Sequence, residues 1–261
     1  MNYQFCAHTD PGRVRDNNED SVTFDASSGL AVLADGMGGY NAGEVASAMA
    51  TTFIRSELGR WLNEAGHQTA ARDVRRAMEI CVDNANRAIF NAANANPQYA
   101  GMGTTLVLAV FQEDRLMLGH IGDSRCYRLR EGVLSRITND HSLLQEQLDA
   151  GLITLDEAAT SPHKNLITRA LGVEDAVLLE VNEHRIVPGD LYLLCSDGLS
   201  DMMDNEAIAA ILRTEVALPD VAMRLIENAN ANGGRDNISV LLVQRSDNFT
   251  KRSLISRILG K

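Results

Sequence analysis

Short apolar runs recur along the chain and predict β-strands, because runs of this length between polar turns are typical of buried strands. Nine such runs cover residues 3–7, 22–24, 30–34, 104–111, 115–121, 124–130, 177–186, 191–196 and 238–244. Several follow one another across a few polar residues, such as QEDR, GDS and REG. Turns this short connect antiparallel strands, so the pattern predicts antiparallel hairpins.

Helical periodicity replaces the strand pattern in two blocks between residues 34 and 104. Further helices are expected at residues 205–214 and 219–231. Strands in runs and helices in pairs together predict an α+β fold, in which helices cover antiparallel sheets. The apolar positions that define the two blocks are Val45, Met49, Phe53, Leu58 and Trp61 in the first, and Val74, Ala77, Cys81, Ala88 and Ile89 in the second.

Composition and charge argue against several functional classes, including nucleic-acid-binding and membrane-spanning proteins. The 261 residues are 45% hydrophobic and carry a net charge of −11. An acidic balance argues against nucleic acid as a partner, because phosphate backbones require a basic surface. No apolar run approaches the ~20 residues of a transmembrane helix, and the N-terminus lacks the pattern of a signal peptide.

The four cysteines indicate a reducing cellular compartment. Cys6, Cys81, Cys126 and Cys195 form no CxxC pair and lie among apolar residues. We interpret them as buried free thiols, which fits a cytoplasmic protein.

Five aspartates share one placement beside glycine, serine or asparagine, at or near the end of a strand-like run. They are Asp20, Asp35, Asp123, Asp197 and Asp236. Any one of them is explained by a turn or a helix cap. Five aspartates with the same placement are better explained by one shared site, formed where the strand ends meet at one rim of the sheets. Unpaired carboxylates there would repel one another unless cations lay between them. Oxygen ligands suit hard ions such as Mg²⁺ or Mn²⁺.

An arginine close to this set indicates the substrate class. Arg15 lies five residues before Asp20. A guanidinium matches phosphate oxygens in a bidentate geometry, so carboxylates, metals and arginine together suggest chemistry on a phosphate ester.

The chain resembles the metal-dependent protein phosphatases of the protein phosphatase 2C family, and its single-domain bacterial members most of all. The resemblance runs from about residue 10 to residue 243 and rests on eight motifs in order: GRVRDNNED, LADGMGGY, GMGTTLVLAV, HIGDSRCYR, NDHSLLQEQLDAGLIT, NLITRALG, LLCSDGLSD and GGRDNISVLLV. It implies a four-layer α/β/β/α sandwich of two antiparallel sheets flanked by helices. The expected catalytic domain covers residues 1–246.

Two segments need a separate interpretation. Residues 141–170 lack the strand pattern and contain two short helix signals, SLLQEQLDAG and TLDEAA. By resemblance they form a mobile flap insertion over the active-site cleft; an ordinary pair of surface helices is the alternative. Residues 247–261 form a basic tail whose apolar positions Leu254, Ile255, Ile258 and Leu259 line one helical face. This tail is either a contact for an acidic partner or membrane surface, or a frayed end.

The resemblance also implies the principal metal ligands. Asp35 would bridge two ions, and the carbonyl of Gly36 would bind one of them. Asp197 and Asp236 would supply the remaining carboxylates of the first ion. The expected cofactor is Mn²⁺ or Mg²⁺, as two ions with a weaker third.

The other site residues follow in the same way. Glu19 and Asp20 would be outer ligands of the second ion, and Asp123 would bind the third ion together with Asp197. Arg15 would bind the phosphate, because the family's arginine lies five residues before the equivalent of Asp20. Arg13 is the competing candidate, and we interpret it as a solvated charge.

The expected reaction is hydrolysis of phosphoserine and phosphothreonine in proteins by a metal-activated water. The partners would be phosphorylated proteins and a cognate serine/threonine kinase, with no nucleic acid, and the enzyme would be a monomer. Met37 stands where animal members have a histidine proposed as proton donor, so the donor stays unassigned. No histidine has zinc-ligand spacing, and only His141, at the start of the flap, is a candidate for a role.

Two alternatives belong to other classes. A non-catalytic phosphoprotein-binding module on the same fold would lack some of the aspartates. A metallohydrolase for nucleotides or nucleic acid is disfavoured by the net charge of −11.

Overall fold

The structure is a computed structural model that describes residues 3–39, 42–161 and 166–245. The expected tail at 247–261 lies outside the described residues. Within those ranges no helix is both long enough and apolar enough to cross a bilayer.

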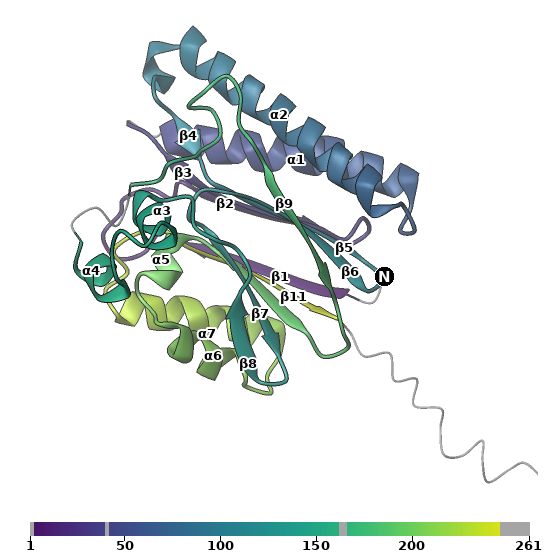
Figure 1. Cartoon of the computed structure of the whole chain (residues 1–261), viewed down its shortest axis with the longest axis vertical. Coiled ribbons are helices and arrows are strands. Elements are labelled where there is room, and N and C mark those ends of the chain that lie inside the picture. The colour runs from purple at the N-terminus through teal and green to yellow at the C-terminus, as the bar shows by residue number, and fades with distance from the viewer. Residues whose placement is uncertain (1–2, 40–41, 162–165, 246–261) are drawn as a thin grey trace, which may run out of the picture.

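Two antiparallel sheets form the centre of the molecule (Figure 1). The first, called the β3 sheet here, has the order β2 (Asp20–Asp25), β3 (Leu30–Met37), β5 (Leu106–Gln112), β6 (Arg115–Ile121) and β9 (Glu180–Arg185), with β4 (Gly103–Thr104) paired to the end of β3. The second, the β10 sheet, has the order β1 (Tyr3–Asp10), β11 (Ile238–Arg245), β10 (Leu191–Cys195), β7 (Arg125–Arg130) and β8 (Val133–Arg136).

Helices cover the outer face of each sheet and complete the four predicted layers (Figure 1). The β3 sheet packs against α1 (Ala42–Ala65) and α2 (Ala71–Ala95), which are joined to β4 through a short 3₁₀ turn (Pro97–Tyr99). The β10 sheet packs against α5 (Asp197–Ser200), α6 (Asn205–Leu212) and α7 (Leu218–Ala231). The helices expected at 205–214 and 219–231 are therefore confirmed.

Three apolar cores separate the four layers, and this explains the near-continuous apolar runs in the sequence. In β5, Leu106, Leu108 and Val110 face the helices. Val107, Ala109 and Phe111 of the same strand face the other sheet. Both faces of such a strand are buried, so the usual alternation of apolar and polar residues disappears.

The hairpin predicted across GDS is wrong. Strand β6 belongs to the β3 sheet, whereas β7 belongs to the β10 sheet, so the chain crosses between sheets at this point. Gly122, with φ of 100°, provides the backbone conformation for the crossing. The edge of β6 pairs with β9 instead. Asp123 consequently lies between the ends of the two sheets.

Two further details differ from the prediction. Strand β8 was missed, because VLSR offers only a short run with intermediate burial. In α1 the helix is confirmed but its buried stripe is not the predicted one: Val45, Met49, Phe53 and Trp61 are only partly buried. The residues against the sheet are the alanines Ala42, Ala46 and Ala50, which allow close approach, and then Ile54, Leu58 and Leu62, of which only Leu58 was predicted.

The segment predicted as a flap contains two short helices, α3 (Leu143–Asp149) and α4 (Leu155–Thr160). Both have a side-chain cap at the N-terminus, Ser142 for α3 and Thr154 for α4. Its two stems meet at a bridge between Ser142 and Ile167. A second bridge, between Thr104 and Leu171, ties the following residues to the end of the β3 sheet.

Candidate functional site

A cavity of about 310 Å³ lies where ends of the two sheets meet. Seven of the eight residues predicted from the sequence line it. Asp20 is buried beside them. The lining residues are Arg15, Asn17, Glu19, Asp35, Gly36, Met37, Gly38, Thr105, Asp123, Ile167, Asp197, Asp236 and Asn237.

Asp20 and Asp35 face one another across the β3 sheet. They are direct cross-strand partners on β2 and β3. Like charges in this position repel each other. Asp20 accepts a hydrogen bond at Oδ2 from the Ser196 hydroxyl, 2.8 Å away. Its Oδ1 is buried without a hydrogen-bond partner, and an uncompensated buried carboxylate oxygen fits a nearby cation.

The β10 sheet contributes the other two carboxylates of the rim. Asp197 is the first residue of α5, directly after β10, and Asp236 lies just before β11. Asp236 accepts at Oδ1 from the backbone N–H of Asn237 at 2.9 Å, and its Oδ2 lies 2.7 Å from the Arg15 guanidinium. Strands adjacent in the sheet thus bring residues 39 positions apart in the chain to one rim.

The backbone at Gly36 is packed too closely for any side chain. A Cβ there would lie 2.1 Å from the carbonyl oxygen of Gly43. The N–H of Gly36 donates to the Glu19 carbonyl at 3.1 Å, which fixes the segment before Asp20 against the end of β3. The absence of a side chain therefore lets the start of α1 and the Glu19 segment pack directly on the end of β3, where Gly36 lines the cavity.

The rim is electrostatically unfavourable for its own carboxylates. Burial, and then the neighbouring aspartates, raise the pKa values of Asp35 and Asp197 well above the usual range. Burial raises the pKa of Asp20 to about 7 and, together with the charge of Asp140, that of Asp123 to about 6. Divalent cations relieve such repulsion. The donor set, all oxygen with no imidazole or thiol among the described lining residues, fits Mg²⁺ or Mn²⁺.

The structure separates the two candidate arginines. Arg15 lines the cavity and pairs with Asp236, whereas Arg13 is held by its backbone N–H to the Gly234 carbonyl at 2.7 Å and is absent from the lining. The Arg15 side chain keeps 54% of its surface exposed, so it remains accessible to a ligand.

Two positioning residues were missed from the sequence. Asn237 accepts from the Glu19 backbone N–H at 2.8 Å and donates to the carbonyls of Pro11 and Asn17 at 3.0 and 2.8 Å. Thr105 accepts from the Asp35 backbone N–H at 3.0 Å. The only sequence signal was their position within GGRDN and GMGTT, because both side chains act on residues distant in the chain.

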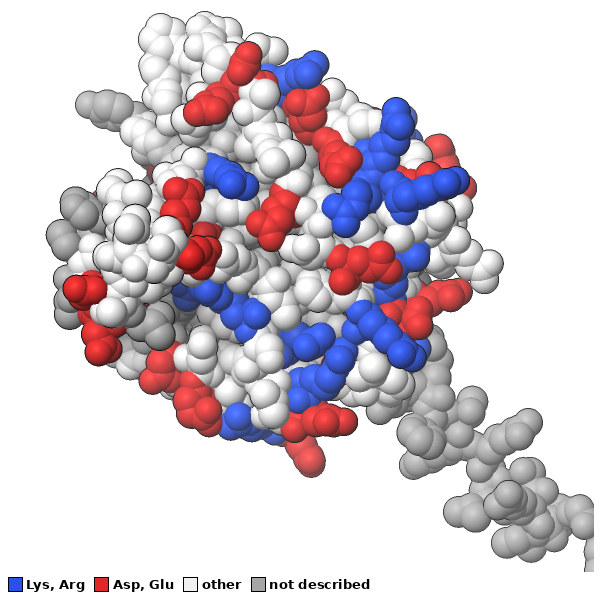
Figure 2. Space-filling view, in the orientation of Figure 1, with Lys and Arg blue, Asp and Glu red and all other residues white. Residues whose placement is uncertain are grey.

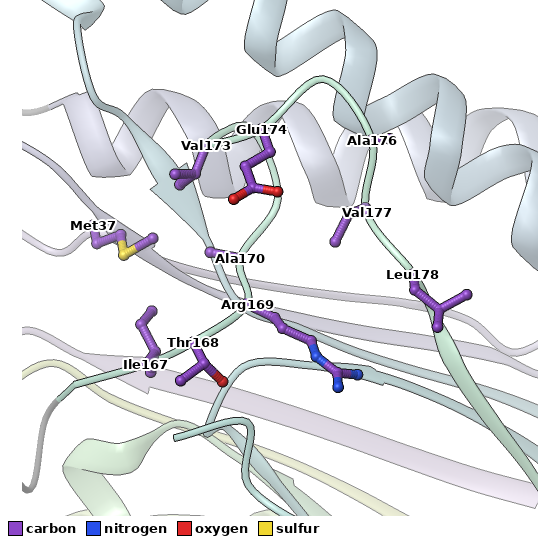
Figure 3. Close-up of a pocket in the computed structure, with 10 residues that line it drawn as sticks. All are labelled: Met37, Ile167, Thr168, Arg169, Ala170, Val173, Glu174, Ala176, Val177 and Leu178. Carbon is purple, nitrogen blue, oxygen red and sulfur yellow. The ribbon is translucent and has the colours of Figure 1, made fainter. Parts of the chain in front are cut away.

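A second cavity, of about 270 Å³, adjoins the first and shares Met37 and Ile167 with it (Figure 3). Figure 3 shows Met37 and Val173 on one side of this cavity, Ile167 and Thr168 below, and Leu178 at the far side. The apolar side chains among them form its apolar wall. Val173 and Leu178 are 50% and 75% exposed. This apolar wall therefore continues from the carboxylate rim onto the surface.

Basic and acidic side chains alternate on the face shown in Figure 2. Several arginines of β7 and β8 form ion pairs: Arg125 and Arg136 with Asp140, and Arg130 with Asp190. The expected absence of nucleic-acid binding stays a prediction. All four cysteines are free, as predicted, and Cys81, Cys126 and Cys195 are buried, whereas Cys6 is only partly buried.

Comparisons with known proteins agree with the resemblance in the sequence. A family model described as Protein phosphatase 2C matches residues 8–240. The serine/threonine phosphatase stp of Listeria monocytogenes is 38% identical over 244 residues, covering 91% of this chain and 94% of the relative. The serine/threonine protein phosphatase PstP of Mycobacterium tuberculosis is 44% identical over 246 residues, 94% of this chain but 45% of that protein.

Solved structures give the same result. A crystal structure of the Mycobacterium tuberculosis phosphatase has a TM-score of 0.84 at 40% identity, covering 93% of this chain and 98% of that one. The catalytic domain of PstP, solved in complex with two manganese ions, has a TM-score of 0.81 at 39% identity, covering 93% and 97%.

The raised pKa values predict how the stability of the chelated protein depends on pH. Between the ordinary aspartate pKa and the raised one, the folded state binds more protons than the unfolded state, so the free energy of unfolding falls as pH rises. Asp123→Asn cannot ionise and escapes this loss. With EDTA present, we expect the variant to be more stable than wild type by on the order of 1–2 kcal/mol at pH 8 and equal to it near pH 4. Urea denaturation at both pH values measures this. A constant difference across the range would contradict the raised pKa.

Proposed function

This chain belongs to the protein phosphatase 2C family, and on that premise we propose which of its residues carry out the reaction. The chain is a metal-dependent serine/threonine protein phosphatase, which hydrolyses phosphoserine and phosphothreonine in proteins. The observation that carries the assignment at this site is the convergence of aspartates from both sheets, with Arg15, on one cavity. A phosphoprotein-binding module without catalysis has no need of the full carboxylate set.

We assign the first ion to Asp35, the Gly36 carbonyl, Asp197 and Asp236. Asp35 would also reach the second ion. The assignment is supported by the raised pKa values of Asp35 and Asp197, which reflect burial first and then the charges of the neighbouring aspartates. When bound, Mn²⁺ or Mg²⁺ lowers the pKa of a water molecule and offsets charge on phosphoryl oxygens.

The remaining ligands are assigned to weaker or outer positions. Glu19 lines the cavity, and Asp20 lies behind it with one unpartnered oxygen, so both suit contacts to the second ion through water or neighbouring groups. Asp123, on the crossover between the sheets, suits the weaker third ion together with Asp197. The charge repulsion between Asp123 and Asp197 supports their shared ion.

The chain's own residues orient the substrate. Arg15 stands at the cavity with an exposed guanidinium, and its contact with Asp236 keeps the donors directed along the rim. A phosphate in the cavity would accept hydrogen bonds from the remaining N–H groups. Met37 lines the same cavity and has no proton to give. We infer that the proton for the departing alkoxide comes from solvent in this open cavity.

We extend the proposal to the cellular setting. All four cysteines are free thiols, which fits a reducing cytoplasm. Every proposed ligand comes from this one chain, which fits a monomer. A phosphatase of this specificity has phosphorylated proteins as partners and would oppose a serine/threonine kinase. Identification of phosphoproteins that accumulate in a deletion strain tests that relation.

Activity on a phosphothreonine peptide should depend on Mn²⁺ or Mg²⁺ and on Asp197. We expect Asp197→Asn to reduce kcat at saturating Mn²⁺ by more than about 100-fold, because the change removes ligand charge from the ions that offset the developing phosphoryl charge. Phosphate release is measured with and without EDTA, and circular dichroism checks the fold. Full activity after exhaustive chelation, or near-native turnover in Asp197→Asn, would overturn the proposed site.

The two arginines should differ in effect. Arg15→Ala removes a charge-assisted contact worth about 1.5–3 kcal/mol, so KM for the peptide should rise more than about tenfold, with a smaller fall in kcat. Arg13→Ala is the matched control and should be near neutral. Steady-state kinetics of both variants decide the assignment; the reverse order of severity would transfer the phosphate contact to Arg13.

The second cavity is placed to hold the polypeptide beside the phosphorylated residue (Figure 3). Leu178→Asp replaces part of its apolar wall with a charge. For a peptide with a leucine near the phosphothreonine we expect KM to rise about fivefold, from the loss of roughly 1 kcal/mol of apolar contact. KM for nitrophenyl phosphate should be unchanged. Val133→Asp, an equally drastic change at an exposed residue of β8, is the control. Equal losses on both substrates in Leu178→Asp would place this wall outside the peptide site.

A further inference from the structure

His141 is buried where the flap leaves the β10 sheet, and it holds the residue before Asp123 through two hydrogen bonds. Its backbone N–H donates to the Gly122 carbonyl at 2.8 Å. Its ring Nδ1 accepts from the Gly122 N–H at 3.2 Å. The ring and the backbone of one residue therefore fix both polar groups of Gly122.

The ring is itself locked in place by β9. Because Nδ1 accepts a hydrogen bond, the ring proton is on Nε2, and Nε2–H donates to the Glu180 carboxylate at 3.1 Å. Glu180 thus selects the tautomer whose Nδ1 is free to accept from Gly122. This carboxylate is oriented in turn by the Asn182 side chain at 2.8 Å.

The same histidine joins the two stems of the flap. Its carbonyl accepts from the Thr168 N–H at 2.8 Å, and next to it the Leu143 N–H donates to the Leu166 carbonyl at 2.9 Å. Ile167, between these contacts, lines the metal-binding cavity. A displacement of the flap stems would therefore be transmitted through His141 to Gly122.

A second histidine holds the residue after Asp123. His120 packs against His141 with ring centroids 4.6 Å apart and donates from Nε2 to the Ser124 carbonyl at 3.0 Å. The Ser124 hydroxyl is 2.7 Å from that of Thr105, which accepts from the backbone N–H of Asp35. The backbone on each side of Asp123 is thus fixed by one of two histidines whose rings are in contact.

We propose that His141 is a positioning residue, which sets the Asp123 carboxylate through Gly122 and so couples the flap to the affinity of the weakest metal ion. The inference rests on the proposed role of Asp123 as ligand of that ion. A movement of the flap stems would then shift the Asp123 carboxylate, because hydrogen bonds connect Glu180, His141 and Gly122 in series.

Three substitutions separate the two hydrogen bonds of the ring. His141→Ala removes both. His141→Asn keeps an acceptor near the position of Nδ1, and His141→Gln keeps a polar group near the position of Nε2. Binding of Mn²⁺ is measured by calorimetry and by the electron paramagnetic resonance signal of free Mn²⁺. We expect Kd of the weakest site to rise about tenfold in the Ala and Gln variants, with the Asn variant close to wild type and the tighter sites unchanged.

Two further variants complete the test. Asp123→Ala should remove the weakest site, and adding His141→Ala to it should have no additional effect on Mn²⁺ binding. Glu180→Ala keeps His141 and the backbone contacts of the flap stems, but removes the carboxylate that holds the ring proton on Nε2. We expect it to raise the same Kd about threefold, and this variant replaces His141→Ala if that variant does not fold.

The outcomes distinguish the possible errors. If Asp123→Ala removes a site but His141→Ala and Glu180→Ala leave its Kd unchanged, the positioning role is wrong and the proposed ligands stand. Equal losses in the Asn, Gln and Ala variants would make the role one of general packing and also overturn the inference. If Asp123→Ala leaves the Mn²⁺ isotherm unchanged, the assignment of Asp123 fails and the inference fails with it.

Discussion

Mutual repulsion among buried carboxylates is the constraint on which the rest of this structure depends. Asp20 and Asp35 oppose each other on neighbouring strands. Asp197 and Asp123 approach from the other sheet and from the crossover, and each raises the pKa of Asp35. A flexible chain would relieve this repulsion by moving the carboxylates apart. Here β3 carries Asp35, and Asp123, Asp197 and Asp236 adjoin the ends of β6, β10 and β11. These four strands are packed on both faces, which restricts movement of the carboxylates apart.

The rigidity has an identifiable origin in the layers. The apolar runs of β3, β5, β10 and β11 are buried between the sheets and beneath the helices, and the hydrophobic burial of three cores stabilises one unfavourable rim. Local hydrogen bonds then fix the position of these carboxylates or of the backbone that carries them. Ser196 holds Asp20, Thr105 holds the backbone of Asp35, and Asn237 joins the Glu19 segment to the start of β11. The cluster of mutually repelling carboxylates is the functional feature. It lowers the free energy of unfolding, and the apolar packing of the surrounding fold offsets that loss.

The sequence predicts most of the elements because both strands and helices follow from local pattern. It predicts the site residues because their motifs are short and ordered. It fails where the answer depends on the partner element. The GDS turn has the length of a hairpin loop, but the edge of β6 is paired with β9, and the chain after the turn enters the other sheet. In α1, large apolar residues such as Phe53 suggested the buried face, whereas close packing on the sheet selects the alanine stripe. Asn237 and Thr105 act on residues distant in the chain, so no local pattern identifies them.

The most direct test of the account is the release of protons when Mn²⁺ binds. Carboxyls whose pKa values are raised to about 6 and about 7, as for Asp123 and Asp20, are partly protonated near neutral pH and must ionise to accept a cation. Calorimetric titration with Mn²⁺ in buffers of different ionisation enthalpy gives the number of protons released. We expect net proton release at pH 6 that declines toward pH 8. Binding without proton release at either pH would contradict it, because the carboxylates would then be ionised and unstrained before any metal arrives.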